Sequence, residues 1–156
     1  MSEASDPTAG WFEGREHRLP VRVYYEDTDF TGVVYHANYL KYFERGRSDF
    51  LRMTGCGHSV LLAREDPLAF VVSTMELVFL KPARIDDALT VGTAYDAISG
   101  ARIAIRQRLM RGADILTTAA VQVACIGLDK RPRRPPPSLV QGLQPFLLPK
   151  SADPPP

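Results

Sequence analysis

Little in the composition points to disulfide, metal or nucleic-acid chemistry. The 156-residue chain has two cysteines, three histidines and a net charge of +1. Cys56 and Cys125 lie far apart without a CxxC spacing, and the histidines are too scattered for helical metal-ligand spacing, so we expect no disulfide framework and no metal site. The balanced charge gives no reason to expect nucleic acid as a partner. We therefore expect a reduced, cytoplasmic protein.

Long apolar runs are also lacking. No run approaches the roughly 18 residues of a membrane-spanning helix, and residues 1–11 lack the basic start and apolar centre of a signal peptide. The length and the apolar content of 45% fit one domain. We predict a disordered N-terminal segment over residues 1–17, a folded domain over residues 18–135, and a C-terminal extension over residues 136–156 with a short helix and a proline-rich tail.

Most of the reactive side chains fall in residues 24–40. Residues 21–25, which overlap the start of this stretch, alternate between apolar and polar side chains as in a half-buried strand. From Tyr39 to Met53, apolar side chains recur at spacings of three and four, which predicts a helix over residues 37–53 with one buried face. The acidic loop in between therefore connects a strand to a helix.

This loop places a carboxylate just before a helix start. The first backbone N–H groups of a helix have no partner within it and carry a partial positive charge, so they can hold an anion or a developing oxyanion. Asp29 lies upstream and can act as a base or a nucleophile if the loop folds back. His36 falls at the first turn, where its side chain can orient a water or a thioester carbonyl. Together these features indicate an acyl-transfer site.

Simpler roles for the same residues stay open. Aspartate is a common turn former, and for Asp27 we favour that role. Asn38 is expected to cap the helix or brace the loop, and Tyr35 to do the same or to line a pocket. The spacing of Asp27 and Asp29 copies the opening of a calcium-binding loop, but the twelfth position is Asn38 and a strand precedes the loop, so that interpretation fails.

Other nucleophile and base candidates are weaker. No Gly-x-Ser-x-Gly elbow is present. Cys56 follows the predicted helix without a base nearby in the sequence. His17 and His58 fall in predicted loops without reactive neighbours, so we expect neither to have a chemical role.

Four further segments are rich in β-forming residues: 70–80, 88–97, 102–110 and 115–128. Short turns join them, which favours antiparallel neighbours. One strand, one long helix and four long strands predict an α+β domain with a helix laid across an antiparallel sheet.

The run DTDFTGVVYHANY over residues 27–39, with ERGR at residues 44–47, closely resembles the hotdog-fold acyl-CoA thioesterases. The nearest subgroup is the YbgC-like, Tol-Pal-associated one within the 4-hydroxybenzoyl-CoA thioesterase family. Similarity continues more loosely through LKPAR at residues 80–84 and spans residues 19–135. The resemblance implies an antiparallel sheet wrapped around one long central helix, and a homodimer or homotetramer with active sites at the subunit interface.

The resemblance also implies roles for individual residues. Asp29 matches the catalytic carboxylate of the family, and His36 the histidine whose backbone N–H is the oxyanion donor. The remaining matched positions are expected to contact the substrate: Gly32, Val33, Tyr35 and Asn38. The implied substrate is an acyl-CoA thioester, and no cofactor is expected beyond the coenzyme A of the substrate itself.

Three functions are compatible with these observations. The first is hydrolysis of acyl-CoA, with Asp29 acting either as base or as nucleophile. The second is binding of acyl-CoA or an acyl carrier protein without turnover, for which the basic helix face of Lys41, Arg45 and Arg52 is a candidate surface. The third is a hydratase or dehydratase, which the fold also supports. The basic run at residues 130–134 is either a patch for the phosphates of coenzyme A or a solvated linker.

Overall fold

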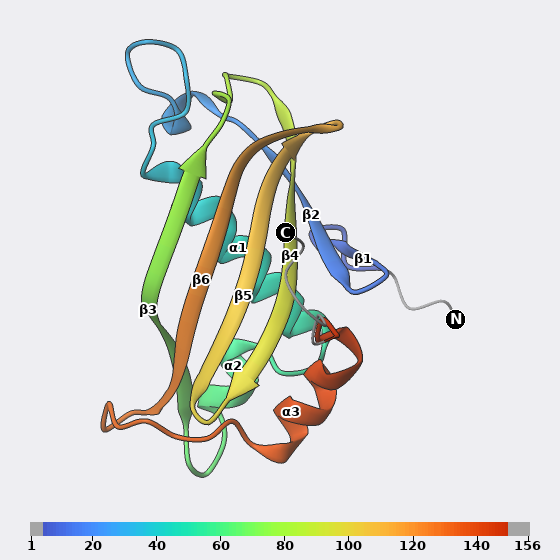
Figure 1. Cartoon of the computed structure of the whole chain (residues 1–156), viewed down its shortest axis with the longest axis vertical. Coiled ribbons are helices and arrows are strands. Elements are labelled where there is room, and N and C mark those ends of the chain that lie inside the picture. Colours follow the sequence, from blue (N-terminus) through green and yellow to red (C-terminus); the bar gives the residue numbers. More distant parts are fainter. Residues whose placement is uncertain (1–4, 150–156) are drawn as a thin grey trace, which may run out of the picture.

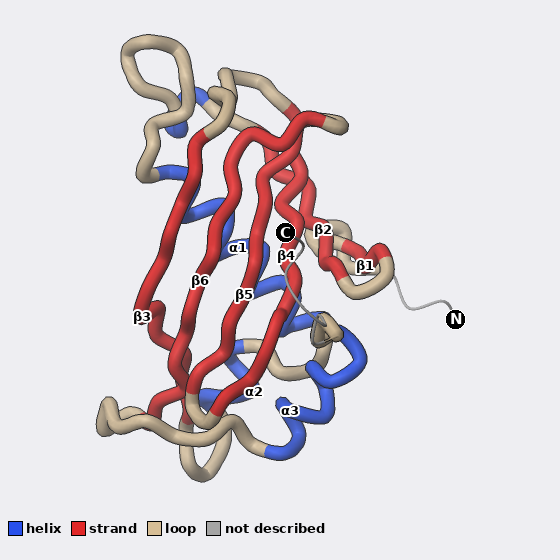
Figure 2. The backbone as a smooth tube through the Cα atoms, viewed as in Figure 1, coloured by secondary structure: helices blue, strands red, loops and turns tan. Residues whose placement is uncertain are grey.

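The computed structural model describes residues 5–149 and consists of one antiparallel sheet with a long helix across one of its faces (Figures 1 and 2). The strands are β1 (Trp11–Glu13), β2 (Glu16–Arg22), β3 (Leu68–Phe79), β4 (Ala88–Ser99), β5 (Arg102–Arg111) and β6 (Asp114–Gly127). The helices are α1 (Asn38–Met53), α2 (His58–Leu62) and α3 (Pro137–Leu143), with short 3₁₀ turns η1 (Tyr25–Asp27) and η2 (Gln144–Phe146).

The strand order is β1-β2-β4-β5-β6-β3, and every neighbouring pair is antiparallel. The predicted α+β hotdog architecture is confirmed. β3 comes directly after the helical segment in the chain but pairs with β6, so it forms one edge of the sheet while β1 forms the other. Residues 21–25 do not form one strand, because β2 ends at Arg22 and Tyr25 begins η1.

Helix α1 packs its aromatic face on the sheet. Tyr42, Phe43 and Phe50 are buried in the core, and Lys41 lies on the exposed face, as the spacing predicts. Gly46 lies where the helix meets β4: a Cβ there would lie 2.7 Å from Val91 Cγ1. The close approach of helix and sheet therefore requires glycine at this position.

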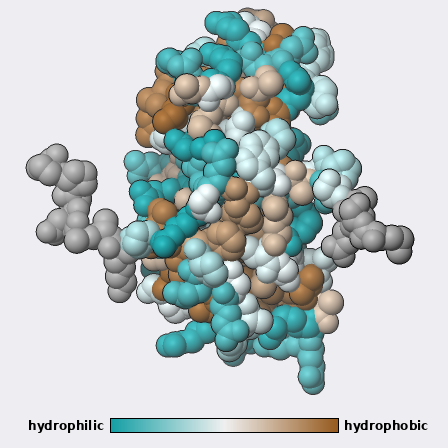
Figure 3. Space-filling model, turned by 90° about the vertical axis from the view of Figure 1, so that its right-hand side faces the viewer, coloured by the Kyte–Doolittle hydropathy of each residue, from teal (hydrophilic) through white to brown (hydrophobic). Residues whose placement is uncertain are grey.

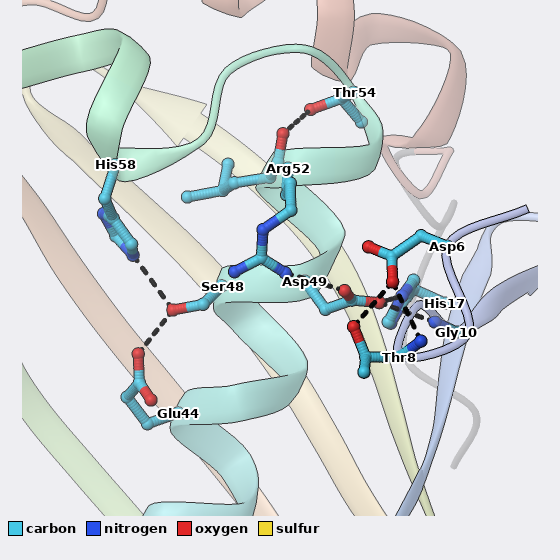
Figure 4. Close-up of polar contacts among 11 residues, drawn as sticks. Asp6, Thr8, Gly10, His17, Glu44, Ser48, Asp49, Arg52, Thr54 and His58 are labelled. Carbon is cyan, nitrogen blue, oxygen red and sulfur yellow. Dashed lines mark hydrogen bonds and ion pairs between the residues drawn. The ribbon is translucent and has the colours of Figure 1, made fainter. Parts of the chain in front are cut away.

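The predicted disorder of residues 1–17 is wrong for residues 11–13, 16 and 17, which lie in strands. Residues 11–13 form β1, and β2 begins at Glu16. His17 is completely buried, with its Nε2 2.7 Å from Asp49 Oδ2 on α1, and the Gly10 N–H donates to the same oxygen at 2.8 Å (Figure 4). Phe12 stacks on Phe146 with ring centroids 4.2 Å apart. These contacts join segments far apart in the sequence, so composition alone did not reveal them. Residues 1–4 lie outside the described part.

The C-terminal extension contains the predicted short helix. Leu139 and Leu143 of α3 are buried, and the helix begins at Pro137. The proline-rich tail lies outside the described residues from position 150 onward. Within residues 5–149, no helix is long and apolar enough to cross a membrane.

Candidate active site

Asp27 holds the loop against the start of α1. Its backbone carbonyl accepts hydrogen bonds from the Tyr35 N–H and from Asn38 Nδ2, both at 2.9 Å. Its carboxylate accepts the Tyr24 N–H at 2.8 Å. Burial, together with this carboxylate, raises the pKa of the Tyr42 hydroxyl. The buried Asp27 is therefore a structural residue, as its turn-forming pattern predicts, and Asn38 braces the loop.

Asp29 sits in a tight turn that closes on itself. Its N–H donates to the Val33 carbonyl at 2.9 Å, and Gly32 has φ = +85°, a conformation that favours glycine. The Asp29 Oδ1 accepts hydrogen bonds from the N–H (2.8 Å) and hydroxyl (2.6 Å) of Thr31. These bonds lower the pKa of Asp29, with a smaller contribution from His36. The carboxylate is thus ionised at neutral pH.

The start of α1 offers backbone donors. The helix has no side-chain cap at its N-terminus. The N–H groups of His36, Ala37 and Tyr39 have no acceptor among residues 5–149, whereas the Asn38 N–H bonds to the Tyr35 carbonyl at 2.8 Å. Free N–H groups at a helix start attract negative charge.

Of these three residues, His36 and Tyr39 line a shallow cleft of about 300 Å³ between the start of α1 and the end of β3. The lining residues are Val34, His36, Tyr39, Phe79, Leu80, Lys81 and Pro82. Phe79 packs edge-on against Tyr39 with ring centroids 5.4 Å apart, yet half of its surface is exposed. The cleft thus combines an apolar wall with the unpaired backbone donors.

The structure brings together some of the predicted site residues. His36 lines the cleft, and its ring lies 4.6 Å from that of Tyr35, measured between centroids. Asp29 is close enough for the charge of His36 to influence its pKa, but its hydrogen bonds go to Thr31 and not to the helix start. Gly32 and Val33 shape the turn rather than the cleft.

Sequence reasoning missed the wall formed by residues 79–82. The sequence signal that could have revealed this wall is the apolar pair Phe79 and Leu80, which directly precedes Lys81 and Pro82 at the end of a predicted strand. Its position opposite His36 depends on the pairing of β3 with β6, which no local pattern reveals.

Two histidines outside the cleft, His17 and His58, contact polar side chains that the sequence analysis did not predict. His17 pairs with Asp49, as described above. His58 begins α2, and its Nε2 lies 3.0 Å from Ser48 Oγ, which also bonds to the Glu44 carboxylate (Figure 4). The expectation that both histidines lie in loops is wrong, because His17 lies in β2 and His58 in α2.

Cys56 is a poor nucleophile here, because burial raises the pKa of its thiol. In the part of the chain that the structure describes, no three or more His, Cys, Asp or Glu side chains gather in a group that could hold a metal ion.

Known proteins are similar to this chain in sequence and fold. The family model described as "Thioesterase-like superfamily" matches residues 23–150. The chain belongs to this thioesterase-like family. A curated relative, "Acyl-CoA thioesterase YbgC" of Haemophilus influenzae, is 50% identical over 112 residues, which cover 72% of this chain and 82% of that protein. "Acyl-CoA thioester hydrolase YbgC" of Escherichia coli O6:H1 is 41% identical over 125 residues, covering 79% and 92%.

A solved structure of a probable thioesterase has a similar fold. A probable thioesterase from Bartonella henselae superimposes on this thioesterase-like chain with a TM-score of 0.76 at 46% identity, covering 78% of this chain and 99% of that one. The predictions of a YbgC-like hotdog protein and of a thioesterase enzyme are therefore confirmed at the level of the family.

Proposed function

We propose that this protein hydrolyses the thioester bond of an acyl-CoA, releasing a free acid and coenzyme A. The observation that supports this most strongly is the apolar cleft at the uncapped start of α1, which His36 lines. The ionised carboxylate of Asp29 lies on the loop that leads to this helix start. The YbgC relatives carry names that describe the same reaction.

In the proposed reaction the thioester oxygen points at the N–H groups near His36. Negative charge grows on that oxygen as the carbonyl carbon becomes tetrahedral, and fixed donors stabilise it without reorganisation; removing one such donor typically costs about 3 kcal/mol of barrier. The N–H and hydroxyl of Thr31 hold the Oδ1 of Asp29. In the proposed reaction the carboxylate fixed in this way acts on the substrate or on water.

Two routes complete the reaction. In the first, Asp29 takes a proton from water, the water oxygen bonds to the carbonyl carbon, and the C–S bond breaks as the thiolate leaves and takes up a proton. In the second, Asp29 itself attacks, the thiolate leaves, and water then hydrolyses the mixed anhydride. In both, His36 orients the substrate or assists proton transfer, and all catalytic groups come from this chain, without a cofactor.

We also propose that two copies pair through β3. This edge strand is twelve residues long, and Val71, Val72 and Val78 along it are each close to half exposed. An exposed apolar edge of this length is usually paired or protected. On the side that faces right in Figure 1, by contrast, apolar and polar residues are interspersed (Figure 3). A tetramer, and the cytoplasmic location expected from the cysteines, stay predictions.

An acyl carrier protein is the alternative carrier of the acyl group. Lys41, Arg45 and Arg52 are exposed along one side of α1, which suits an acidic partner. Arg52 is also paired with Asp49 at 2.8 Å. In this second function the protein would hold the thioester without cleaving it.

A panel of acyl-CoAs separates these functions. Release of free thiol, measured colorimetrically, is expected for the proposed hydrolase. Tight binding without thiol release would favour the binding function, and a change in enoyl absorbance would favour a hydratase. Either of these outcomes, without thiol release for any chain length, contradicts the proposal.

A further inference from the structure

The N-terminal hairpin, residues 10–18, is attached to the C-terminal half of α1 through one carboxylate. Asp49 Oδ2 accepts hydrogen bonds from His17 Nε2 at 2.7 Å and from the Gly10 N–H at 2.8 Å (Figure 4). The other carboxylate oxygen, Oδ1, pairs with Arg52 at 2.8 Å. His17 and Asp49 are both buried. The Asp49 carboxylate therefore holds both arms of the hairpin against the helix.

The C-terminal segment, residues 144–147, packs on this hairpin. Phe146 stacks on Phe12 with ring centroids 4.2 Å apart, and Arg15 donates to the Leu147 carbonyl at 2.6 Å. Both phenylalanine rings also contact Phe50 of α1, with centroid distances of 5.1 and 5.5 Å. The two ends of the chain thus form one unit on α1, which we call the terminal clasp: residues 10–18 and 144–147.

The His17 ring has a partner for only one of its nitrogens. Its Nδ1 is buried without a hydrogen-bond partner among residues 5–149. Because Nε2 donates its proton to Asp49, the neutral ring carries no proton on Nδ1. The rings of Phe12 and Phe50 lie 5.3 and 5.8 Å away, measured between centroids. A proton added at Nδ1 would create a buried N–H without an acceptor, which costs free energy.

The charged groups around His17 act on it through Asp49. On α1, the Asp49 carboxylate favours the protonated ring, but Arg52 shares that carboxylate. On the segment before the hairpin, Asp6 lies within the influence of the Arg52 charge. On β4, the residue opposite His17 is the uncharged Thr93. Burial lowers the pKa of His17 despite the attraction of Asp49.

We propose that the terminal clasp is an acid-sensitive device, which opens locally from α1 when His17 takes up a second proton. Opening places the ring in water, where both nitrogens can donate to solvent. It also uncovers the aromatic cluster of Phe12, Phe50 and Phe146. This inference is independent of the proposed function, because it concerns the two chain ends and not the cleft.

The clasp lies where local opening breaks few contacts. β1 is a three-residue edge strand that pairs only with β2. His17 begins the pairing of β2 with β4, which continues to Arg22. Chain ends and edge segments open at a lower free energy than the strands of a core. The remaining pairs of β2 and the rest of the sheet can therefore stay folded when the clasp opens.

The size of the effect follows from the two protonation equilibria. The ring in the open clasp titrates near pH 6.5, whereas the closed clasp binds the proton only at lower pH. Closure is therefore fully favoured above pH 6.5 and weakens as the pH falls below it. Between pH 7.5 and pH 5.5, the ratio of open to closed molecules should rise by up to about tenfold.

Hydrogen–deuterium exchange measures this opening segment by segment. With labelling times corrected for the intrinsic exchange rate at each pH, the protection of residues 10–18 and 144–147 should fall together, by up to about tenfold, from pH 7.5 to pH 5.5. Residues 102–110 of β5 should keep their protection. Equal protection of the clasp at both pH values, or an equal loss throughout the sheet, would contradict the proposal.

The role of His17 is tested by substitution. His17→Gln keeps a donor for Asp49 but does not titrate, so the clasp should lose its pH dependence. His58→Gln makes the same change in a histidine on α2, outside the clasp, and should behave as the wild type. An undiminished pH dependence in His17→Gln would contradict the proposal.

A second variant covers the case in which His17→Gln does not fold. Asp49→Asn removes the charge that favours the protonated ring and keeps an oxygen that accepts from Nε2. Its loss of protection at pH 5.5 should equal or exceed that of the wild type. A smaller loss would show that protonation of His17 does not open the clasp.

The coupling of the two chain ends is tested with Phe146→Ala at pH 7.5. Without the ring that stacks on Phe12, the protection of residues 10–18 should fall as well as that of residues 144–147. Gln144→Ala, an exposed position on the same segment, is the matched control. A loss confined to residues 144–147 would show that the two ends open separately.

Discussion

At the scale of single residues, local sequence predicted the loop better than the partners of its side chains. The roles of Asp27 and Asn38 as braces follow from short-range turn chemistry, and the structure shows both. Thr31, which holds the Asp29 carboxylate, was not predicted, although it lies only two residues away. His17 and Asp49 are 32 residues apart, so nothing local could pair them.

The buried His17 should make stability depend on pH. Burial lowers the pKa of His17 in the folded state, opposed by Asp49. Below the usual pKa of about 6.5, the unfolded chain binds a proton that the folded chain binds less well, so the free energy of unfolding should fall as the pH drops below 6.5. Above 6.5 this contribution is fully present.

Urea unfolding at pH 7.5 and pH 5.5 checks this. The variant His17→Gln keeps a donor for Asp49 but does not titrate, so its loss of stability between the two pH values should be smaller than that of the wild type. An equal loss in both proteins would show that other groups cause the pH dependence.

At the scale of elements, the sequence pattern predicted the long helix α1 and four of the six strands. The helix predicted over residues 37–53 begins one residue later, and each of the four long strands lies within two residues of its predicted bounds. The strands that it missed are β1 and most of β2 (Glu16–Arg22), which overlaps the strand predicted over residues 21–25 only at residues 21 and 22. Three residues joined to β2 by a tight turn give no periodic signal. The order of strands, which creates the cleft opposite His36, depends on long-range pairing and was implied only by the family resemblance.

The contact between α1 and β4 is tested by Gly46→Ala. Alanine is about 1 kcal/mol better than glycine within a helix, but here its Cβ would lie 2.7 Å from Val91 Cγ1 and 2.8 Å from Thr93 Oγ1. Overpacking should dominate and lower the free energy of unfolding by roughly 1–3 kcal/mol. Lys41→Ala, on the exposed face of the same helix, is the control. A stabilised Gly46→Ala variant would contradict the close packing.

At the scale of the whole molecule, the proposed dimer covers the exposed edge of β3. A double change, Val71→Lys with Val78→Lys, places like charges on both halves of the exposed edge of β3 and should yield a folded monomer. Light scattering after size exclusion measures the mass, and circular dichroism checks the fold. If β3 is the dimer contact, the measured mass should fall to that of one chain. A variant that stays dimeric would contradict pairing through β3.

The most direct measurement of the central claim compares thiol release by the wild type, Asp29→Asn and Glu26→Gln under saturating acyl-CoA. Glu26 is an exposed carboxylate three residues from Asp29 on the same loop and controls for the general loss of a charge. We expect Asp29→Asn to lose about 10²–10⁴-fold in kcat with an unchanged melting temperature, and Glu26→Gln to retain its turnover. Near-normal kcat in Asp29→Asn would contradict the assignment of this carboxylate to catalysis.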